Sequence, residues 1–423
     1  MTDHGTFDLA GRLRRTLADH LVRDGCLTDP GWRAAVEAVP REVFLGSAIA
    51  GPTGHGDCWE VVRRDDVTAD EWLELVYHDE TWVTQLDEAM VKSTPKAEGT
   101  AVAEDAPKVE NAAVAKSDAM AGKAPGAEAV PEAGGARNVV SGRPTSSSTM
   151  PGLVVRMLEV AGISDGDTVL EIGTGTGYST ALMCHRLGSA AVTSVEYDRV
   201  VAGRAREALA AAGYAPTLVT GDGLAGYDKT AEYDRLIATC SIRYVPLPWL
   251  WQVRDGGTIT APLSGWLGGG AFAHLTIADD GTAGGRFLRD DLHFMTARPH
   301  GRPPLAAPHL GIGEVRDGRV DPRVLDDRTG AFVAHLAVPS AVRLGGGGEV
   351  VLWDVGTGSL AEVTSGTVRQ RGPLRLWDAV EDAVLTWRAA GSPDQTAFGL
   401  TVTPARQYVW LGDPDGPSWD LPA

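Results

Sequence analysis

A glycine-rich stretch near the middle of the chain has residue types and spacing suited to ligand binding. Residues 167–182 read DTVLEIGTGTGYSTAL, a strand-like run that passes into Gly173, Gly175 and Gly177 and then into a helical pattern. Glycines there leave room for a ligand against the backbone, and the N–H groups of the following helix point toward the turn. A second predicted strand ends at Glu196, about twenty residues further on, where a carboxylate can accept both hydroxyls of a ribose. The spacing predicts a nucleoside-type ligand.

The acidic residues around this turn distinguish between two classes of ligand. Glu171 closely precedes the turn, and a third predicted strand ends in a Gly-Asp-Gly stretch that contains Asp222 and Gly223. The glycine pattern is GxGxG rather than the GxGxxG of dinucleotide sites. A carboxylate at the turn repels a pyrophosphate but attracts an ammonium or sulfonium group. The pattern therefore favours S-adenosylmethionine over a dinucleotide, and a methyltransferase over a dehydrogenase.

A second stretch, VVLWDVGTGSLAEV at 350–363, resembles the first in its letters only. It lacks the third glycine, and no acidic strand end follows at the required distance. The residues after the glycines continue a strand pattern instead of starting a helix. We predict a hairpin turn there, without a ligand.

The elements around the first stretch alternate between helix and strand. Predicted helices at 152–162, 178–188 and 199–213 alternate with strands that end near residues 172, 196 and 220, and two more strands follow at 233–242 and 256–263. This alternation predicts right-handed crossovers and a parallel sheet with helices on both faces. The expected fold class is α/β, a doubly wound Rossmann-like methyltransferase sheet with a helical N-terminal cover and a small, β-rich C-terminal α+β domain.

Composition divides the chain into four predicted parts. Residues 1–88 contain two amphipathic helical patterns, at 6–25 and at 29–39, and form the cover. Residues 89–141 are rich in Ala, Glu, Lys, Pro and Gly and are predicted to be a disordered insert, because they cannot bury enough apolar area to fold. Residues 142–300 form the ligand-binding core. Residues 301–423 form the C-terminal accessory domain, with one clear helix at 375–391.

Charge and composition exclude several functions. The net charge of −18 argues against nucleic acid as a partner, because a phosphate backbone is repelled. No apolar run is long enough to suggest a signal core or a membrane span, so we expect a cytoplasmic protein with no membrane partner. The four cysteines lack CxxC spacing and the ten histidines lack HxH or HExxH spacing, so no metal site is predicted. Cys240 is interpreted as a small buried hydrophobe.

Several stretches resemble the protein-L-isoaspartate O-methyltransferase family, in that family's order. They are AVPREVF (38–44), VYHD (76–79), the run from SSSTMPG through the glycine turn (146–182), GDG (221–223), YDRLIATCSIRYVP (233–246) and VRDGGTITAPL (253–263). The combination is specific and covers roughly residues 15–88 and 142–265. The resemblance implies S-adenosylmethionine as the cofactor and an isoaspartyl- or aspartyl-containing protein or peptide as the substrate. The ester formed on the isoaspartyl carboxylate cyclises to a succinimide, which hydrolyses partly back to aspartate.

The resemblance also assigns roles to individual residues. Thr149 matches the hydroxyl position of the family's Ser-x-Pro motif, with Ser148 beside it, and these are the expected catalytic residues. Tyr77 and Asp79 match the family's Tyr-x-Asp segment and are expected near the substrate, although a surface loop has the same spacing. The serine-rich run also fits an ordinary N-cap before the helix at 152. The positions expected to contact the cofactor are Ser147, Glu171, Gly173, Gly175, Gly177, Glu196, Asp222 and Gly223.

Two departures from the family leave the substrate open. The insert at 89–141 separates VYHD from SSSTMP, and about 120 C-terminal residues have no counterpart in the housekeeping repair enzyme. Extended members of this kind resemble methyltransferases that esterify an Asp of a ribosomally made peptide to give aspartimide or isoaspartate. General repair, dedicated peptide maturation and small-molecule methylation are therefore the alternatives. A non-catalytic S-adenosylmethionine-binding module would require a damaged motif, and none is visible.

Overall fold

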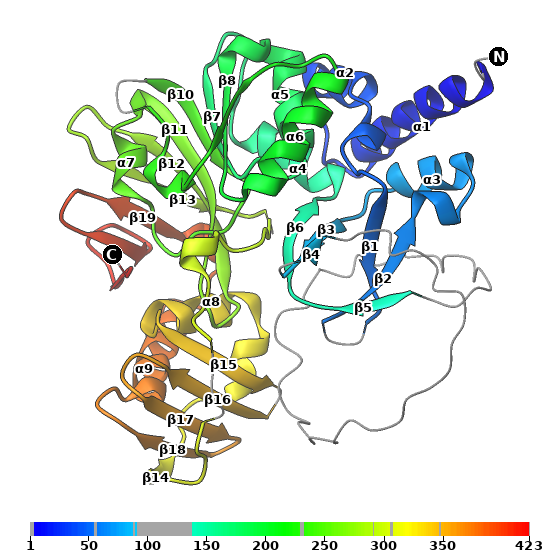
Figure 1. Ribbon diagram of the computed structural model, residues 1–423. Helices are drawn as coiled ribbons and strands as arrows, with labels where there is room; N and C mark the ends of the chain where they lie inside the picture. Colours follow the sequence, from blue (N-terminus) through cyan, green and yellow to red (C-terminus); the bar gives the residue numbers. More distant parts are fainter. Residues whose placement is uncertain are drawn as a thin grey trace, which may run out of the picture.

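The computed structural model describes residues 4–54, 57–87, 89–90, 138–228, 232–290, 292–304, 308–346 and 348–422 (Figure 1). Most of the insert predicted at 89–141 lies outside the described residues. The described ends of that insert are the short strands β4 (Ala89–Met90) and β5 (Val139–Ser141), which belong to the N-terminal sheet.

A ten-stranded sheet forms the centre of the molecule, in the order β21-β20-β19-β13-β12-β11-β10-β7-β8-β9. Its parallel half contains β7 (Val169–Ile172), β8 (Val192–Glu196), β9 (Thr217–Thr220), β10 (Tyr233–Ala238) and β11 (Val253–Ser264). The connecting helices are α4 (Pro151–Val160), α5 (Tyr178–Leu187), α6 (Arg199–Ala211) and α7 (Leu247–Leu250). The predicted doubly wound α/β fold is confirmed.

The inner parallel strands β7, β8 and β10 are largely buried, and their side chains alternate between two hydrophobic cores. Leu170 and Ile172 of β7 pack into the core that contains Trp249 of α7. Val169 packs into the other core, with Leu182 of α5 and the N-terminal helices. Glu171 has the same parity as Val169, so its side chain points toward α5.

The antiparallel half of this sheet differs from the predicted domain division. It contains β12 (Gly270–Ile277), β13 (Ala283–Leu288), β19 (Phe398–Val402), β20 (Gln407–Leu411) and β21 (Ser418–Asp420). Because β13 pairs directly with β19, the last strands of the chain extend the central sheet. The boundary expected at residue 300 therefore does not separate two domains.

A smaller α+β module is inserted between β13 and β19. Its five-stranded sheet has the order β14-β18-β17-β16-β15. The strands are β14 (Glu314–Asp317), β15 (Ala341–Gly346), β16 (Glu349–Asp354), β17 (Ser359–Thr364) and β18 (Thr367–Arg371), and the helices are α8 (Arg328–Ala337) and α9 (Leu376–Ala389). Residues 355–358 join β16 and β17 as a hairpin, which confirms the turn predicted for the second glycine stretch.

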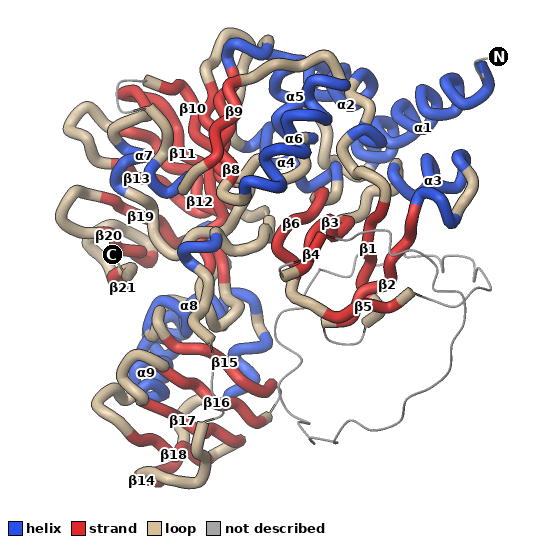
Figure 2. Tube along the Cα trace, in the orientation of Figure 1, coloured by secondary structure: helices blue, strands red, loops and turns tan. Residues whose placement is uncertain are grey.

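The N-terminal region is a mixed layer rather than the helical cover expected from the sequence. It contains α1 (His4–Arg23), α2 (Pro30–Ala38), α3 (Ala69–Val76), β1 (Ala48–Pro52), β2 (Cys58–Arg63), β3 (Trp82–Leu86) and β6 (Pro144–Ser148). These strands form, with β4 and β5, a six-stranded sheet in which β6 pairs with β3. The strands of the central sheet, the N-terminal sheet and the inserted module form three separate groups (Figure 2).

Strand β6 matters most for the site, because it belongs to the N-terminal sheet although it follows the insert in sequence. Its residues Ser147 and Ser148 lie opposite Val83 and Trp82 of β3. Helix α4 begins directly after it, at Pro151. At Thr149 the serine-rich run therefore leaves strand β6 of the N-terminal sheet and leads into helix α4 of the central domain.

Candidate active site

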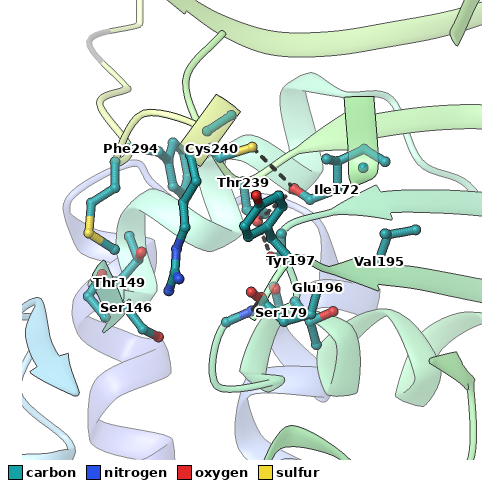
Figure 3. Close-up of a pocket in the computed structure, with 18 of the residues that line it drawn as sticks. Ser146, Thr149, Ile172, Ser179, Val195, Glu196, Tyr197, Thr239, Cys240 and Phe294 are labelled. Carbon is teal, nitrogen blue, oxygen red and sulfur yellow. Dashed lines mark hydrogen bonds between the residues drawn. The ribbon is translucent and has the colours of Figure 1, made fainter. Parts of the chain in front are cut away.

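A pocket opens at the carboxyl ends of the parallel strands, where doubly wound sheets bind ligands (Figure 3). One wall is the glycine turn, residues 173–177, together with the ends of β8, β9 and β10. A second wall is residues 145–149, from β6 to the start of α4. The third wall is residues 294–299, which we call the strap. Three segments that are distant in sequence thus enclose one cavity.

The glycine turn divides its three glycines between two tasks. Gly173, Gly175 and Gly177 have φ values of 99°, 56° and 91°, which L side chains rarely adopt. Gly173 and Gly175 line the pocket. Gly177 does not line it. A Cβ at Gly177 would lie 3.3 Å from Cγ of Leu209, so the glycine allows α5 to pack closely on α6. The contact predicted between Gly177 and the cofactor is therefore corrected.

Two carboxylates line the opposite side of the turn. Glu196 ends β8, and its Oε2 accepts a hydrogen bond from the N–H of Gly175 at 2.8 Å, while its Oε1 accepts one from the N–H of Asp198 at 2.9 Å. Burial raises the pKa of Glu196, and these backbone donors oppose the shift. A carboxylate has about four acceptor positions, so Glu196 retains capacity for ligand hydroxyls. Asp222 and Gly223 also line the pocket.

Glu171 is not in the pocket, contrary to the sequence prediction. Its side chain is fully buried, with 0% exposure. Ser179 donates to Oε1, and Thr180 and Ser194 donate to Oε2 at 2.5 and 2.7 Å. Burial raises its pKa to about 6. Because its parity on β7 points it beneath α5, Glu171 supports the start of that helix and does not reach a ligand.

Three consecutive hydroxyl-bearing residues of the serine-rich run lie at the pocket wall. Ser147, Ser148 and Thr149 all line it. The alternative N-cap interpretation is not supported, because the N-cap of α4 is Met150 and makes no side-chain cap. Within the described part of the chain, the hydroxyls of these three residues make no hydrogen bond. They are therefore available to a ligand.

Tyr77 and Asp79 do not line this pocket, and their predicted place near the substrate stays a prediction. The Tyr77 hydroxyl donates to Glu42 and accepts from Arg14 at 3.2 Å. Asp79 accepts from the N–H of Gly152 at 2.7 Å, in the first turn of α4. Asp79 thus supplies the cap that the serine-rich run does not, and it fixes the helix that follows Thr149.

Arg41 is a supporting residue whose role the sequence did not reveal. Its buried guanidinium donates to the carbonyl oxygens of Val76, His78 and Glu80 at 2.5, 2.8 and 2.9 Å. A longer bond of 3.4 Å reaches the carbonyl of Thr149. Burial lowers the pKa of Arg41 to about 10, so it stays charged at neutral pH. Arg41 therefore joins the loop that contains Asp79 to the residue at the pocket wall.

The strap was also missed, because no motif marks it. Its backbone pairs with Ser241, which follows β10: the N–H of Ser241 donates to Met295 at 2.9 Å, and the N–H of Ala297 donates to the Ser241 carbonyl at 2.9 Å. Cys240 lines the pocket beside the strap and is half-buried. Burial raises the pKa of its thiol to about 12, so the sulfur is neutral and unsuited to nucleophilic attack.

The charges of the lining residues select the ligand. The charged side chains that line the pocket are the carboxylates of Glu196 and Asp222 and the guanidinium of Arg298. Their net charge is negative. Such a pocket favours a cationic ligand over one with phosphates. Among the described residues, no group of three His, Cys, Asp or Glu side chains is arranged to hold a metal ion. No helix in the same residues has the length and hydropathy to cross a bilayer.

Part of this region is similar in sequence to known proteins. The sequence model of the family described as protein-L-isoaspartate(D-aspartate) O-methyltransferase matches residues 136–270. A protein-L-isoaspartate O-methyltransferase of Ignicoccus hospitalis is 41% identical over 115 residues, which are 27% of this chain and 54% of that protein. An Archaeoglobus fulgidus protein-L-isoaspartate O-methyltransferase 2 is 38% identical over 115 residues, 27% of this chain and 52% of its own.

The chain thus spans about half the length of the curated relatives it matches. Among solved structures, a protein-L-isoaspartate O-methyltransferase aligns over 95% of this chain and 100% of its own, with a TM-score of 0.48 and 18% identity. A putative enzyme of the same name from Plasmodium falciparum, in complex with S-adenosyl-L-homocysteine, aligns over 67% and 97%, with a TM-score of 0.40 and 11% identity.

Proposed function

We propose, from the premise that residues 136–270 belong to the protein-L-isoaspartate O-methyltransferase family, that this chain methylates the carboxylate of isoaspartyl residues in proteins or peptides. S-adenosylmethionine is the proposed methyl donor. The observation that carries the proposal is the pocket itself. Acidic strand ends form one wall, and another contains Ser147, Ser148 and Thr149, whose hydroxyls make no hydrogen bond among the described residues.

The residues of the pocket fit this donor without contradiction. Glu196 is placed to accept the hydroxyls of a ribose at the end of β8. The glycine turn lets the backbone approach the ligand, since a Cβ at Gly175 would lie in the pocket, 3.6 Å from the carbonyl oxygen of Ser147 on the facing wall. When bound, the donor supplies a methyl group on a positively charged sulfur.

The acceptor requires positioning rather than activation. A carboxylate is already ionised and nucleophilic at neutral pH, so its oxygen forms the new C–O bond as the carbon–sulfur bond breaks and no proton moves. The hydroxyl of Thr149 can donate to that carboxylate and align it, with Ser148 beside it. Positioning of this kind supplies about 7–11 kcal/mol in favourable cases. The absence of a histidine or an activated thiol among the lining residues agrees with such chemistry.

A second candidate differs in the choice of substrate. The family match ends at residue 270, whereas the inserted module and the strands β19–β21 lie beyond it. This extra structure favours an acceptor peptide that the chain recognises through more than its isoaspartyl residue. Dedicated maturation of an aspartyl peptide is therefore the alternative to general repair.

The test is a methyl-transfer assay with two matched peptides. The protein is incubated with radiolabelled S-adenosylmethionine and either an isoaspartyl peptide or the aspartyl peptide of identical sequence. Base-labile label on the isoaspartyl peptide alone supports the repair activity. Label on neither peptide contradicts general repair and favours a dedicated acceptor. Label on an added small carboxylic acid instead contradicts both candidates.

A further inference from the structure

Arg298 connects three parts of the molecule at the edge of the pocket. It lies in the strap and lines the cavity. Its Nη2 is 2.9 Å from Oδ2 of Asp198, 3.0 Å from Oε1 of Gln85 and 3.4 Å from the carbonyl of Thr145. Asp198 begins α6 of the central domain, whereas Gln85 and Thr145 belong to β3 and β6 of the N-terminal sheet. The guanidinium of Arg298 thus connects the strap to the central domain and to the N-terminal sheet.

The partners of Arg298 are also bonded to one another. Gln85 donates through Nε2 to Oδ2 of Asp198 at 3.2 Å and accepts from the hydroxyl of Thr145 at 2.9 Å. Asp198 accepts from the N–H groups of Val200 and Val201, which fixes its carboxylate at the N-terminus of α6. We call Arg298, Asp198, Gln85 and Thr145 the Arg298 cluster. Each member is held before any ligand arrives.

The strap is attached differently at its two sides. On the core side its backbone pairs with Ser241, and the Ser241 hydroxyl donates to the carbonyl of Phe294 at 2.8 Å. Toward the N-terminal sheet, the hydrogen bonds that the described residues show are those of the Arg298 side chain. The core side is thus held by two backbone hydrogen bonds and one side-chain hydrogen bond, whereas the other side depends on one side chain, which can detach and reattach.

We propose that Arg298 is a positioning residue that closes the strap over the bound methyl donor and sets the rate at which the donor and its demethylated product leave. The proposal rests on the proposed function, which places S-adenosylmethionine in this pocket. Closure seals the gap between the strap and β6, so water is excluded from the reacting carboxylate and sulfonium. Opening of the cluster lets the product escape, a step that often limits turnover.

A role in ligand exchange is separable from a role in stability. The Arg298 side chain is 37% exposed and that of Asp198 is 14% exposed. Ion pairs at such exposure contribute little to the free energy of unfolding. Loss of Arg298 should therefore leave the unliganded fold almost unchanged and act on the residence time of the ligand.

The experiment measures S-adenosylhomocysteine binding to the full chain by calorimetry and its dissociation by stopped-flow fluorescence. Arg298→Ala and Asp198→Asn are each expected to raise the Kd about tenfold, mainly through faster dissociation, because each removes charge-assisted hydrogen bonds. Asparagine keeps the cap of α6, so this variant should fold. Arg298→Lys is expected to be intermediate, since an ammonium lacks the planar fork of donors. The matched control is Arg289→Ala, an arginine 79% exposed and paired with Asp394 outside the pocket.

The outcomes separate this proposal from the proposed function. If the two variants act through one cluster, the double variant should also weaken binding about tenfold rather than about a hundredfold. Unchanged dissociation in Arg298→Ala, or additive losses in the double variant, would overturn the proposal while the methyl donor assignment stands. A loss of affinity matched by a drop in the unliganded unfolding midpoint of more than about 4 °C would also overturn it, because that indicates a structural role. If the wild-type protein does not bind the ligand, both proposals fail.

Discussion

The two glycine turns of this chain show how similar letters serve different structures. The first follows Glu171 and connects β7 to α5, and the second follows Asp354 and connects β16 to β17. In each, the preceding carboxylate is buried and accepts from nearby hydroxyls. Asp354 accepts from the N–H and the hydroxyl of Thr357 at 2.8 and 2.9 Å. The acid therefore stabilises the local backbone in both places and does not make either turn a site.

The neighbours of each turn account for the difference. The first turn ends a central parallel strand, so the carboxyl ends of β8, β9 and β10 lie beside it and contribute Glu196, Asp222 and Cys240 to a shared wall. The second turn closes an antiparallel hairpin, so β15 and β17, the two strands that pair with β16, begin rather than end beside it. A ligand site thus requires several strand ends of the same direction, and a glycine pattern indicates one only in that context.

The largest expected effect comes from a side chain placed in each turn. Gly175→Val should weaken S-adenosylhomocysteine binding at least about a hundredfold, because a branched residue at φ 56° is strained and its side chain enters the pocket. Gly358→Val, at φ 72° in the hairpin, carries similar strain away from the pocket and should bind normally. Calorimetry on both variants checks this comparison, and equal affinities would break it.

The hydroxyls of the two regions provide the next comparison. Thr149→Val should lower kcat about thirtyfold while the Kd of S-adenosylhomocysteine changes less than about threefold, because one hydrogen bond to the charged acceptor is lost. Thr357→Val removes the hydroxyl that bonds to Asp354 and should lower only the unfolding midpoint. Steady-state kinetics measure the change in kcat, and calorimetry measures the change in the Kd of S-adenosylhomocysteine. An unchanged kcat in Thr149→Val would exclude this hydroxyl from the mechanism.

The buried acid of the first turn gives a pH-dependent prediction. The pKa of Glu171 is about 6 in the fold, above the ordinary 4.5, so the folded chain binds more protons than the unfolded chain between those values. The contribution of Glu171 to stability is therefore complete below about pH 4.5 and is lost as the pH rises through about 6. Relative to Glu171→Gln, the wild-type free energy of unfolding should fall by about 2 kcal/mol across this window. Urea titrations at several pH values test it, and a constant difference would contradict the assignment.

The smallest expected effect is at the acidic strand end. Glu196→Gln should weaken S-adenosylhomocysteine binding about tenfold, since one charge-assisted acceptor for the ribose is lost. Glu362 of β17, which accepts from the N–H of Gly311 at 2.7 Å, is the matched carboxylate of the inserted module. Glu362→Gln should bind the ligand like the wild type. Equal losses in the two variants would indicate a general effect of charge rather than a contact.

The sequence predicted the parts of the site that local pattern determines. The strand–turn–helix at 167–182 and the acidic end at Glu196 follow from period and spacing, and both are in the expected place. The sequence could not show that Glu171 points beneath α5, because that depends on which face of β7 the helix covers. It also could not place Asp79 as the cap of α4 or Arg298 at the pocket wall. Those contacts join segments 73, 153 and 213 residues apart, which no local pattern encodes.

The pairing of β13 with β19 could not be predicted from the sequence for the same reason. Residues 398–411 read as strands, but their sequence does not specify whether they join the module or return to the central sheet. Composition alone therefore predicted a domain boundary at a place where the chain leaves the central sheet, forms the inserted module and returns to the same sheet at β19.

The central claim is that the first turn holds a phosphate-free methyl donor of the S-adenosylmethionine type. Calorimetric titration of the full chain with S-adenosylhomocysteine, NAD and ATP in parallel tests it most directly. The account predicts saturable binding of S-adenosylhomocysteine at one site per chain, abolished by Gly175→Val and retained by Gly358→Val. Tight binding of NAD or ATP, with no heat from S-adenosylhomocysteine, would contradict it.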